Sequence, residues 1–210
     1  MDSDLNIFLL IGQSNMAGRG QLDKVPTLRN PRVSMFRDGR WTVAEEPLHA
    51  DNPDTAGVGL GMSFAMDLLA PSSRTSIGLV PCAVGGTPLS RWVCGADLYE
   101  NAVSVTRRAL PRGALTGILW HQGESDAGRV AAYHPALMAL ISSWRVHFGQ
   151  VGLPFYWVNL AAFKFPADST GMALAYLREA QSRTLVVPDT GQALAIDLGG
   201  RQDPLPEISQ

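Results

Sequence analysis

The chain alternates short apolar runs with segments in which apolar residues recur at helical spacing. The apolar runs lie at residues 5–12, 76–84, 115–122, 153–161 and 192–198. Because these runs are apolar on both faces, they are typical of parallel strands that are covered by helices on both sides. The segments with helical spacing lie at residues 59–69, 97–110, 131–148 and 172–185.

This alternation of strand and helix predicts a single α/β domain over residues 1–210. We expect a three-layer α/β/α, doubly wound fold with a five-stranded parallel sheet, of the flavodoxin-like kind. Asp97 is expected to cap the second helix, and Pro135 is expected in the first turn of the third. Residues 19–56 show little periodicity and are predicted to form a long connection, a feature that is often functional.

The carboxyl ends of the predicted strands mark the expected site, because open α/β sheets bind their ligands there. This rule brings together three loops, at residues 12–18, 83–92 and 121–127, and a fourth loop at residues 199–206. Any side chain that does chemistry is therefore sought in these loops.

Composition narrows the class of ligand. With 46% hydrophobic and 17% charged residues, the chain has the composition of an ordinary globular domain. Its net charge of −2 provides no basic excess, so nucleic acid is not an expected partner, and a neutral or weakly charged small molecule fits better. The two cysteines, Cys82 and Cys94, are expected to be free thiols. No spacing of metal ligands is present, so no metal is expected.

The N-terminal sequence does not look like a signal peptide, because it opens Met-Asp-Ser-Asp without a basic segment. The apolar run that follows is too short to span a membrane. We therefore expect a cytoplasmic protein, unless a leader was removed, and no membrane partner.

The loop after the first strand, GQSNMAG, holds Ser14 between Gly12 and Gly18. A serine on a tight strand-to-helix turn exposes its hydroxyl and directs backbone N–H groups at the group that it attacks. The alternative is that Ser14 is the N-cap of the next helix, and spacing alone does not decide between the two.

The other two loops also carry polar groups that admit two interpretations. In AVGGTPLSRW, paired glycines let a substrate approach the backbone closely, or they form an ordinary turn. In WHQGESDA, Gln122 offers an amide, and Glu124 and Asp126 offer carboxylates. Alternatively, these acids lie in the first turn of a helix, where negative charge is favourable.

Taken together, GQSNMAG, AVGGTPLSRW, GILWHQGESDA and the later AIDLG resemble the SGNH-hydrolase superfamily, and within it carbohydrate esterase family 6 and the sialate O-acetylesterases. The blocks lie in the family's order between residues 5 and 199. The resemblance implies a hydrolase that removes acetyl groups from carbohydrates, such as acetylated xylan or O-acetylated sialic acid, through an acyl-serine intermediate. The expected partner is a small-molecule or oligosaccharide acetyl ester, and no cofactor is implied.

The resemblance also implies roles for individual residues. Ser14 is the nucleophile, and the oxyanion hole consists of the Ser14 N–H, the Gly85 N–H and the Gln122 side-chain amide. Removing one such donor typically costs ~100- to 1000-fold in rate. The residues expected to support the site or to shape its pocket are Gln13, Asn15, Arg91, Trp92 and Glu124.

The family's general base is where this sequence departs from the pattern. The family takes a histidine from an Asp-x-x-His motif, usually followed by proline, after the fifth strand. Here the stretch reads QDPLPE. If Asp203 is matched to the aspartate, Pro206 replaces the histidine; if the prolines are matched, Leu205 replaces it. Neither side chain accepts a proton, and in a serine triad the loss of the base costs on the order of a millionfold in kcat.

Three explanations remain open at this stage. The sequence is altered or cut short near its C-terminal end, or the protein is a catalytically impaired carbohydrate-binding variant, or another histidine serves as the base. His121 and His49 are the substitute candidates, because His134 and His147 are expected on the long helix. The family also continues with a C-terminal helix, whereas this chain stops at Gln210. We therefore expect an exposed apolar patch on one sheet face, or a contact there that forms a homo-oligomer.

Overall fold

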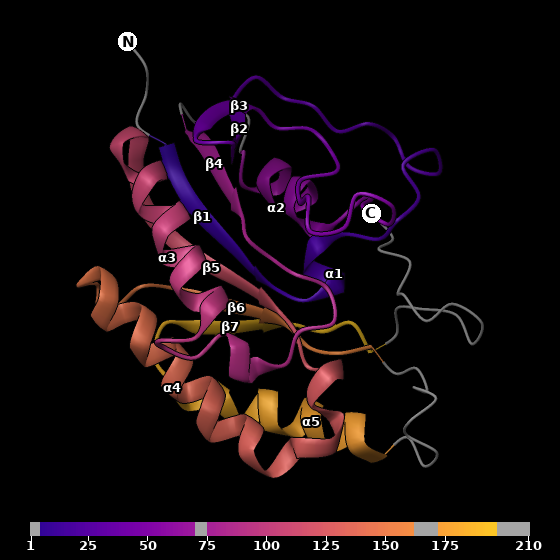
Figure 1. The fold of residues 1–210 in the computed structure, drawn as a ribbon, viewed down its shortest axis with the longest axis vertical. Coiled ribbons are helices and arrows are strands. Elements are labelled where there is room, and N and C mark those ends of the chain that lie inside the picture. Colours follow the sequence, from indigo (N-terminus) through magenta and orange to yellow (C-terminus); the bar gives the residue numbers. More distant parts are fainter. Residues whose placement is uncertain (1–4, 70–74, 162–171, 197–210) are drawn as a thin grey trace.

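The computed structural model describes residues 5–69, 75–161 and 172–196. Its strands form one sheet in the order β3-β2-β4-β1-β5-β6-β7, and neighbours are parallel except for the antiparallel pair β2–β3 (Figure 1). The strands are β1 (Leu5–Gly12), β2 (Val33–Arg37), β3 (Arg40–Val43), β4 (Ser76–Pro81), β5 (Gly113–His121), β6 (Phe155–Val158) and β7 (Thr190–Ala193). The α-helices are α1 (Ser14–Ala17), α2 (Leu60–Leu68), α3 (Asp97–Ala109), α4 (Val130–Phe148) and α5 (Met172–Arg183).

Helices cover the sheet from both sides, which confirms the three-layer, doubly wound α/β/α fold. In Figure 1, α3, α4 and α5 lie on one side of the sheet, and α1 and α2 lie on the other. Each side has its own hydrophobic core. The larger core includes Trp120, Trp144 and Trp157, and the smaller core packs Met16 and Met62 against β1, β2 and β4.

The sheet has seven strands rather than the five that the sequence predicts. The two additional strands, β2 and β3, lie within residues 19–56, the stretch that was predicted to be a long connection with little periodicity. They form a hairpin in which Arg37 faces Arg40 across the two-residue turn Asp38-Gly39. Both turn residues have positive φ, of 52° and 77°, which is the conformation that Asp-Gly favours in tight hairpins. The Asp-Gly pair was therefore a signal for this hairpin.

Several predicted element boundaries also need correction. Asp97 is the first residue of α3 rather than its cap, because Ala96 occupies the N-cap position. Pro135 lies inside α4, beyond its first turn, because that helix already begins at Val130. The strand predicted at residues 192–198 is β7, which begins earlier, at Thr190. The two histidines expected on the long helix, His134 and His147, do lie on α4.

The strand order reverses at β1, and this reversal positions the site. β4 and β5 lie on either side of β1, and both pair with it in parallel. Open α/β sheets bind ligands in the crevice beyond the carboxyl ends of the strands at such a switch point. The loops after β1, β4 and β5 meet there, as the sequence predicts.

Apolar side chains are exposed at the β6–β7 edge of the sheet. Tyr156 alternates along β6 with the core residues Phe155 and Trp157, so it faces away from α4 and α5, and it is 41% exposed. Leu194 and Ile196, which follow β7, are 63% and 50% exposed. The described residues therefore include exposed apolar side chains of the kind expected on one sheet face.

Candidate active site

Ser14 is the first residue of α1, the four-residue helix that directly follows β1. The N-cap position belongs to Gln13, and no side chain caps the helix, so the interpretation of Ser14 as an N-cap is wrong. Within the described ranges, the Ser14 hydroxyl has no hydrogen-bonding partner, and the Ser14 backbone N–H has no acceptor. The side chain is partly exposed. The turn therefore presents a free hydroxyl beside a free N–H.

The turn before Ser14 depends on Gly12. Gly12 has a φ of +135°, and a Cβ at this position would lie 2.2 Å from the carbonyl oxygen of His121. Gly12 pairs with His121 at the end of β5, and the Gln13 N–H donates to the same His121 carbonyl at 2.9 Å. Close packing of β1 on β5 thus fixes the point from which the nucleophile emerges.

Two side chains next to Ser14 reach into the loop after β5. Asn15 donates from Nδ2 to Glu124 Oε1 at 2.5 Å, and both residues are buried. Gln13 accepts the Ser125 N–H on Oε1 at 3.3 Å. These contacts fit the bracing roles expected for Gln13, Asn15 and Glu124. The second oxygen of Glu124 has no partner among the described atoms, and burial raises the pKa of this carboxyl to about 7.

Gln122 lies in a buried polar network beneath the site. Its amide nitrogen donates to the carbonyl oxygen of Thr87 at 3.1 Å and to Oδ2 of Asp126 at 2.6 Å. Its amide oxygen accepts from the Tyr133 hydroxyl at 3.0 Å, and its backbone carbonyl accepts from Gln181 at 3.0 Å. Because an amide nitrogen has two hydrogens, both donors of Gln122 are already engaged.

Asp126 ties the loop after β4 to the loop after β5. The same Oδ2 that accepts from Gln122 also accepts the Leu89 N–H at 2.7 Å, and Asp126 is 6% exposed. Leu89 begins a 3-10 helix (Leu89–Arg91) within the second loop. One carboxylate therefore holds the ends of two loops that are 37 residues apart in sequence.

Gly85, the second expected oxyanion donor, also has an acceptor within the protein. Its N–H donates to Oδ2 of Asp51 at 2.8 Å. Asp51 is in turn paired with Arg19, whose Nη2 lies 2.6 Å from the same oxygen. Of the three expected oxyanion donors, only the Ser14 N–H is therefore without an acceptor among the residues that the structure describes.

The two substitute bases, His49 and His121, are both buried and both 3% exposed. Neither forms a hydrogen bond with Ser14 in the described part of the chain, and both ring nitrogens of His121 lack a partner there. Burial lowers the pKa of each imidazole to about 4, so both are neutral near pH 7. The described part of the structure thus holds both histidines buried and neutral, and it pairs neither of them with the nucleophile.

The expected pocket residues Arg91 and Trp92 differ in their accessibility. Arg91 is exposed and forms an ion pair with Asp97 at the start of α3. Trp92 is fully buried: its Nε1 donates to Thr87 Oγ1 at 3.1 Å, and its ring packs edge-to-face against Trp120. The expectation that Trp92 shapes the substrate pocket is therefore wrong, because it is a core residue.

Sequence reasoning missed Arg19, Asp51, Tyr133 and Gln181 as site-forming residues. Arg19 and Asp51 fall in the stretch predicted as a connection, and Tyr133 and Gln181 lie on helices that pack under the loops. The expected triad aspartate Asp203 and the altered positions Leu205 and Pro206 lie outside the described residues.

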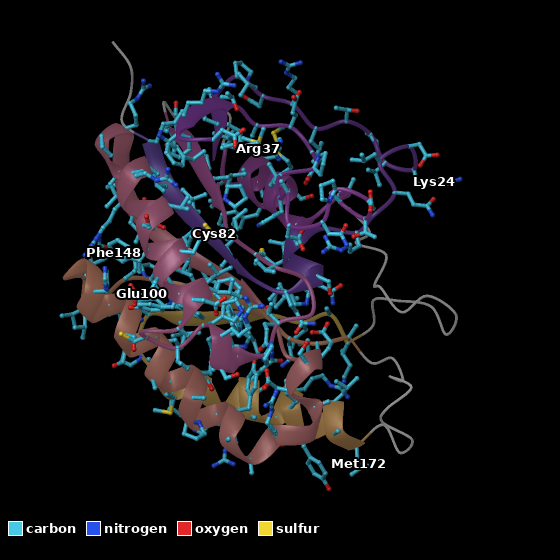
Figure 2. The ribbon with its side chains drawn as sticks, viewed as in Figure 1. Lys24, Arg37, Cys82, Glu100, Phe148 and Met172 are labelled. Atoms are coloured by element: carbon cyan, nitrogen blue, oxygen red, sulfur yellow. The ribbon has the colours of Figure 1, made fainter. Side chains whose placement is uncertain are left out.

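Both cysteines are free, as expected. Cys82 is buried just after β4, at its labelled position in the interior in Figure 2, and burial raises its pKa to about 12. Cys94 is exposed. Within residues 5–69, 75–161 and 172–196, no cluster of three or more His, Cys, Asp or Glu side chains is arranged to hold a metal ion. No helix in these ranges is long and apolar enough to cross a bilayer.

Comparison with known proteins identifies the family. A family model described as carbohydrate esterase, sialic acid-specific acetylesterase, matches residues 4–205. The chain belongs to this carbohydrate esterase family. A probable carbohydrate esterase of Arabidopsis thaliana is 37% identical over 198 residues, which cover 83% of this chain and 74% of that protein. The resemblance stated from the sequence motifs is confirmed.

Three solved structures of other proteins have the same fold. A crystal structure of an Arabidopsis thaliana protein superposes with a TM-score of 0.85 at 32% identity, covering 97% of this chain and 91% of that chain. XAC1771, a carbohydrate acetylesterase from Xanthomonas citri, superposes with a TM-score of 0.72 at 30% identity, and the match covers 97% of this carbohydrate esterase and 52% of XAC1771. NanS, at 18% identity and a TM-score of 0.73, shares the fold.

Proposed function

We propose that this carbohydrate esterase is a serine-dependent acetylesterase in which Ser14 forms an acetyl-enzyme. The observation that carries the proposal is the free Ser14 hydroxyl beside its own free N–H, at the turn from β1 into α1. The names of the related proteins support a carbohydrate acetyl ester as the substrate class.

In the proposed reaction, Ser14 Oγ attacks the acetyl carbonyl carbon and gives its proton to a base. The Ser14 N–H stabilises the negative charge that develops on the carbonyl oxygen. The bond between the acetyl carbon and the sugar oxygen then breaks, and the sugar hydroxyl leaves with a proton. In the second half of the reaction, water attacks the acetyl carbon and loses a proton, the bond between that carbon and Ser14 Oγ breaks, Oγ regains a proton, and acetate is released.

The Gly85 N–H and the Gln122 amide could bind an oxyanion only after a rearrangement of their hydrogen bonds. Each would have to release an acceptor inside the protein, Asp51 or the Thr87–Asp126 pair, before it could bind an oxyanion. Their contacts support a role in holding the loops around Ser14, and the Ser14 N–H is the donor that needs no rearrangement.

A second candidate function is binding of an acetylated carbohydrate with little or no turnover. Two observations favour it: the family's histidine position holds Pro206 or Leu205, and neither His49 nor His121 forms a hydrogen bond with Ser14. Without a positioned base, Ser14 remains a weak nucleophile.

Acetate release from p-nitrophenyl acetate and from acetylated xylo-oligosaccharides separates these candidates. We expect hydrolysis above background that is lost in Ser14→Ala and kept in Ser143→Ala, a matched change on α4. Ser143 donates to the Ala139 carbonyl within its own helix, so its loss leaves the site intact. Equal rates in the wild-type protein and Ser14→Ala would reject the esterase proposal. Calorimetric binding of the acetylated sugar without acetate release would then support the binding function.

A further inference from the structure

The ion pair between Arg19 and Asp51 joins the segment that follows α1 to the segment between β3 and α2. Arg19 Nη2 lies 2.6 Å from Asp51 Oδ2, and Arg19 Nη1 lies 3.3 Å from Asp51 Oδ1. The side chains are only 11% and 4% exposed. This pair is therefore a largely buried, two-point contact, unlike the exposed pair between Arg91 and Asp97.

Arg19 holds the helix that carries the nucleophile. Its Nη1 also donates to the carbonyl oxygen of Gly18 at 2.8 Å, and Gly18 is the C-cap residue of α1. Because α1 is only four residues long, a contact at its C-terminal end restrains Ser14 at its first position. The Gly57 N–H donates to the same Gly18 carbonyl at 3.2 Å, which fixes this end further.

Asp51 holds the peptide group between Val84 and Gly85. The Gly85 N–H donates to Asp51, and the Val84 carbonyl accepts from Thr87 Oγ1 at 2.8 Å. Both polar ends of this peptide are therefore fixed, and so is the orientation of its plane. A Cβ on Gly85 would lie 2.7 Å from Arg19 Nη2 and 3.1 Å from Asp51 Oδ2, so a side chain there would have to displace the ends of the ion pair.

The charge on Asp51 is maintained at neutral pH. Burial alone would raise the pKa of this carboxyl, but the hydrogen bonds from Arg19 and from the Gly85 N–H outweigh burial and hold the pKa below its usual value. A charged acceptor forms a stronger hydrogen bond with a backbone N–H than a neutral one does.

We propose that Arg19 and Asp51 are positioning residues for the esterase reaction, and that their ion pair fixes the Val84–Gly85 peptide relative to Ser14 on α1. This inference rests on the proposed function. Each residue acts through the segment that it holds: Arg19 through the C-terminal end of α1, and Asp51 through the Val84–Gly85 peptide. Misplacing reacting groups by about 1 Å can cost ~100-fold in rate. Loss of the Arg19–Asp51 ion pair should therefore lower kcat and leave KM nearly unchanged.

The test compares Asp51→Asn with Asp54→Asn, which removes the same charge from an exposed position in the same segment. We expect kcat for p-nitrophenyl acetate to fall at least ~10-fold in Asp51→Asn, with KM within ~2-fold, and no change in Asp54→Asn. Gly85→Ala should reproduce the loss, because its Cβ displaces the pair. Circular dichroism checks that each variant is folded at the assay temperature.

Amide hydrogen exchange at Gly85, followed by NMR, provides a readout that does not depend on activity. Exchange should accelerate at least ~10-fold in Asp51→Asn and stay unchanged in Asp54→Asn. An unchanged kcat, a raised kcat, or a change confined to KM would overturn the positioning role, as would unchanged exchange at Gly85. If the wild-type protein shows no Ser14-dependent hydrolysis, the proposed function fails. The exchange experiment then tests by itself whether the Arg19–Asp51 ion pair fixes Gly85.

Discussion

Polar groups beneath the site and polar groups beside Ser14 are buried to a similar degree, but they differ in their hydrogen bonding. Beneath the site, Gln122 and Asp126 are linked to each other and to Thr87, Leu89 and Tyr133. Near Ser14, Glu124 Oε2 has no partner among the described atoms. The same holds for the two expected substitute bases, at His49 Nε2 and at both ring nitrogens of His121.

The difference in hydrogen bonding distinguishes the groups that hold the loops in place from the groups that could activate Ser14. Paired groups hold the loops in one arrangement, because breaking any contact leaves a buried donor or acceptor unsatisfied. Unpaired groups shift toward their neutral forms: burial raises the pKa of Glu124 to about 7 and lowers that of His121 to about 4. The described residues thus provide a well-positioned Ser14 without a base hydrogen-bonded to it.

The largest expected effect on stability comes from breaking the paired region. Asp126→Ala removes the acceptor of both the Leu89 N–H and a Gln122 N–H. Two buried donors left unsatisfied should lower the free energy of unfolding by about 4 kcal/mol. Urea denaturation measures this loss, and a change below about 1 kcal/mol would show that the network does not hold the loops.

Glu124→Gln tests the unpaired region. The folded-state pKa of about 7 lies above the ordinary glutamate value of 4.5, so the folded protein holds the proton more tightly, and stability falls as pH rises from 4.5 through 7. Glutamine keeps the acceptor for Asn15 but does not titrate. We expect the variant to be more stable by on the order of 3 kcal/mol near pH 8, and to match the wild-type protein near pH 4.

Denaturation curves at the two pH values provide the comparison for Glu124. A variant that is less stable than the wild-type protein near pH 8 would contradict this account. That result would mean that the charged carboxylate is paired in the folded protein.

The location of the candidate site could be predicted from the sequence, but its long-range contacts could not. The motif around Ser14 and the alternation of strands and helices were sufficient to locate the turn after β1 and the loops after β4 and β5. The contact between Asp51 and Gly85 joins residues 34 positions apart, and no local pattern reports such a pairing. Trp92 was misassigned because an aromatic residue after Arg91 in a loop suits a pocket as well as a core.

The β2–β3 hairpin was missed for a different reason. Its strands are only five and four residues long, and one face of β3 is exposed, so their apolar periodicity is weak. The Asp38-Gly39 turn was a stronger signal than the periodicity. Short edge strands are more reliably found from their turns than from their apolar pattern.

Restoring the family's histidine tests whether a general base for Ser14 is the one element that the site lacks. Pro206→His and Leu205→His each place a histidine at one of the two candidate positions, and a positioned general base contributes ~100-fold or more in rate. We expect one of the two variants to raise kcat for p-nitrophenyl acetate at least ~100-fold, and the gain to disappear when Ser14→Ala is added. If neither variant gains activity, the base is not the only missing element.

The smallest effect is expected at the surface. Arg91→Ala breaks an exposed ion pair with Asp97, and such pairs contribute little to stability. Thermal unfolding should show no measurable change in Tm. A raised KM with an unchanged kcat would place Arg91 in contact with the substrate, whereas a clear fall in Tm would show that the pair supports the fold.

In the proposed reaction, Ser14 is the residue that takes the acetyl group. Intact-mass spectrometry after brief exposure to p-nitrophenyl acetate, followed by peptide mapping, shows which residue carries it. We expect one added acetyl group, located on Ser14, in the wild-type protein and none at this position in Ser14→Ala. Acetylation that is spread over lysines and is the same in both proteins would contradict it.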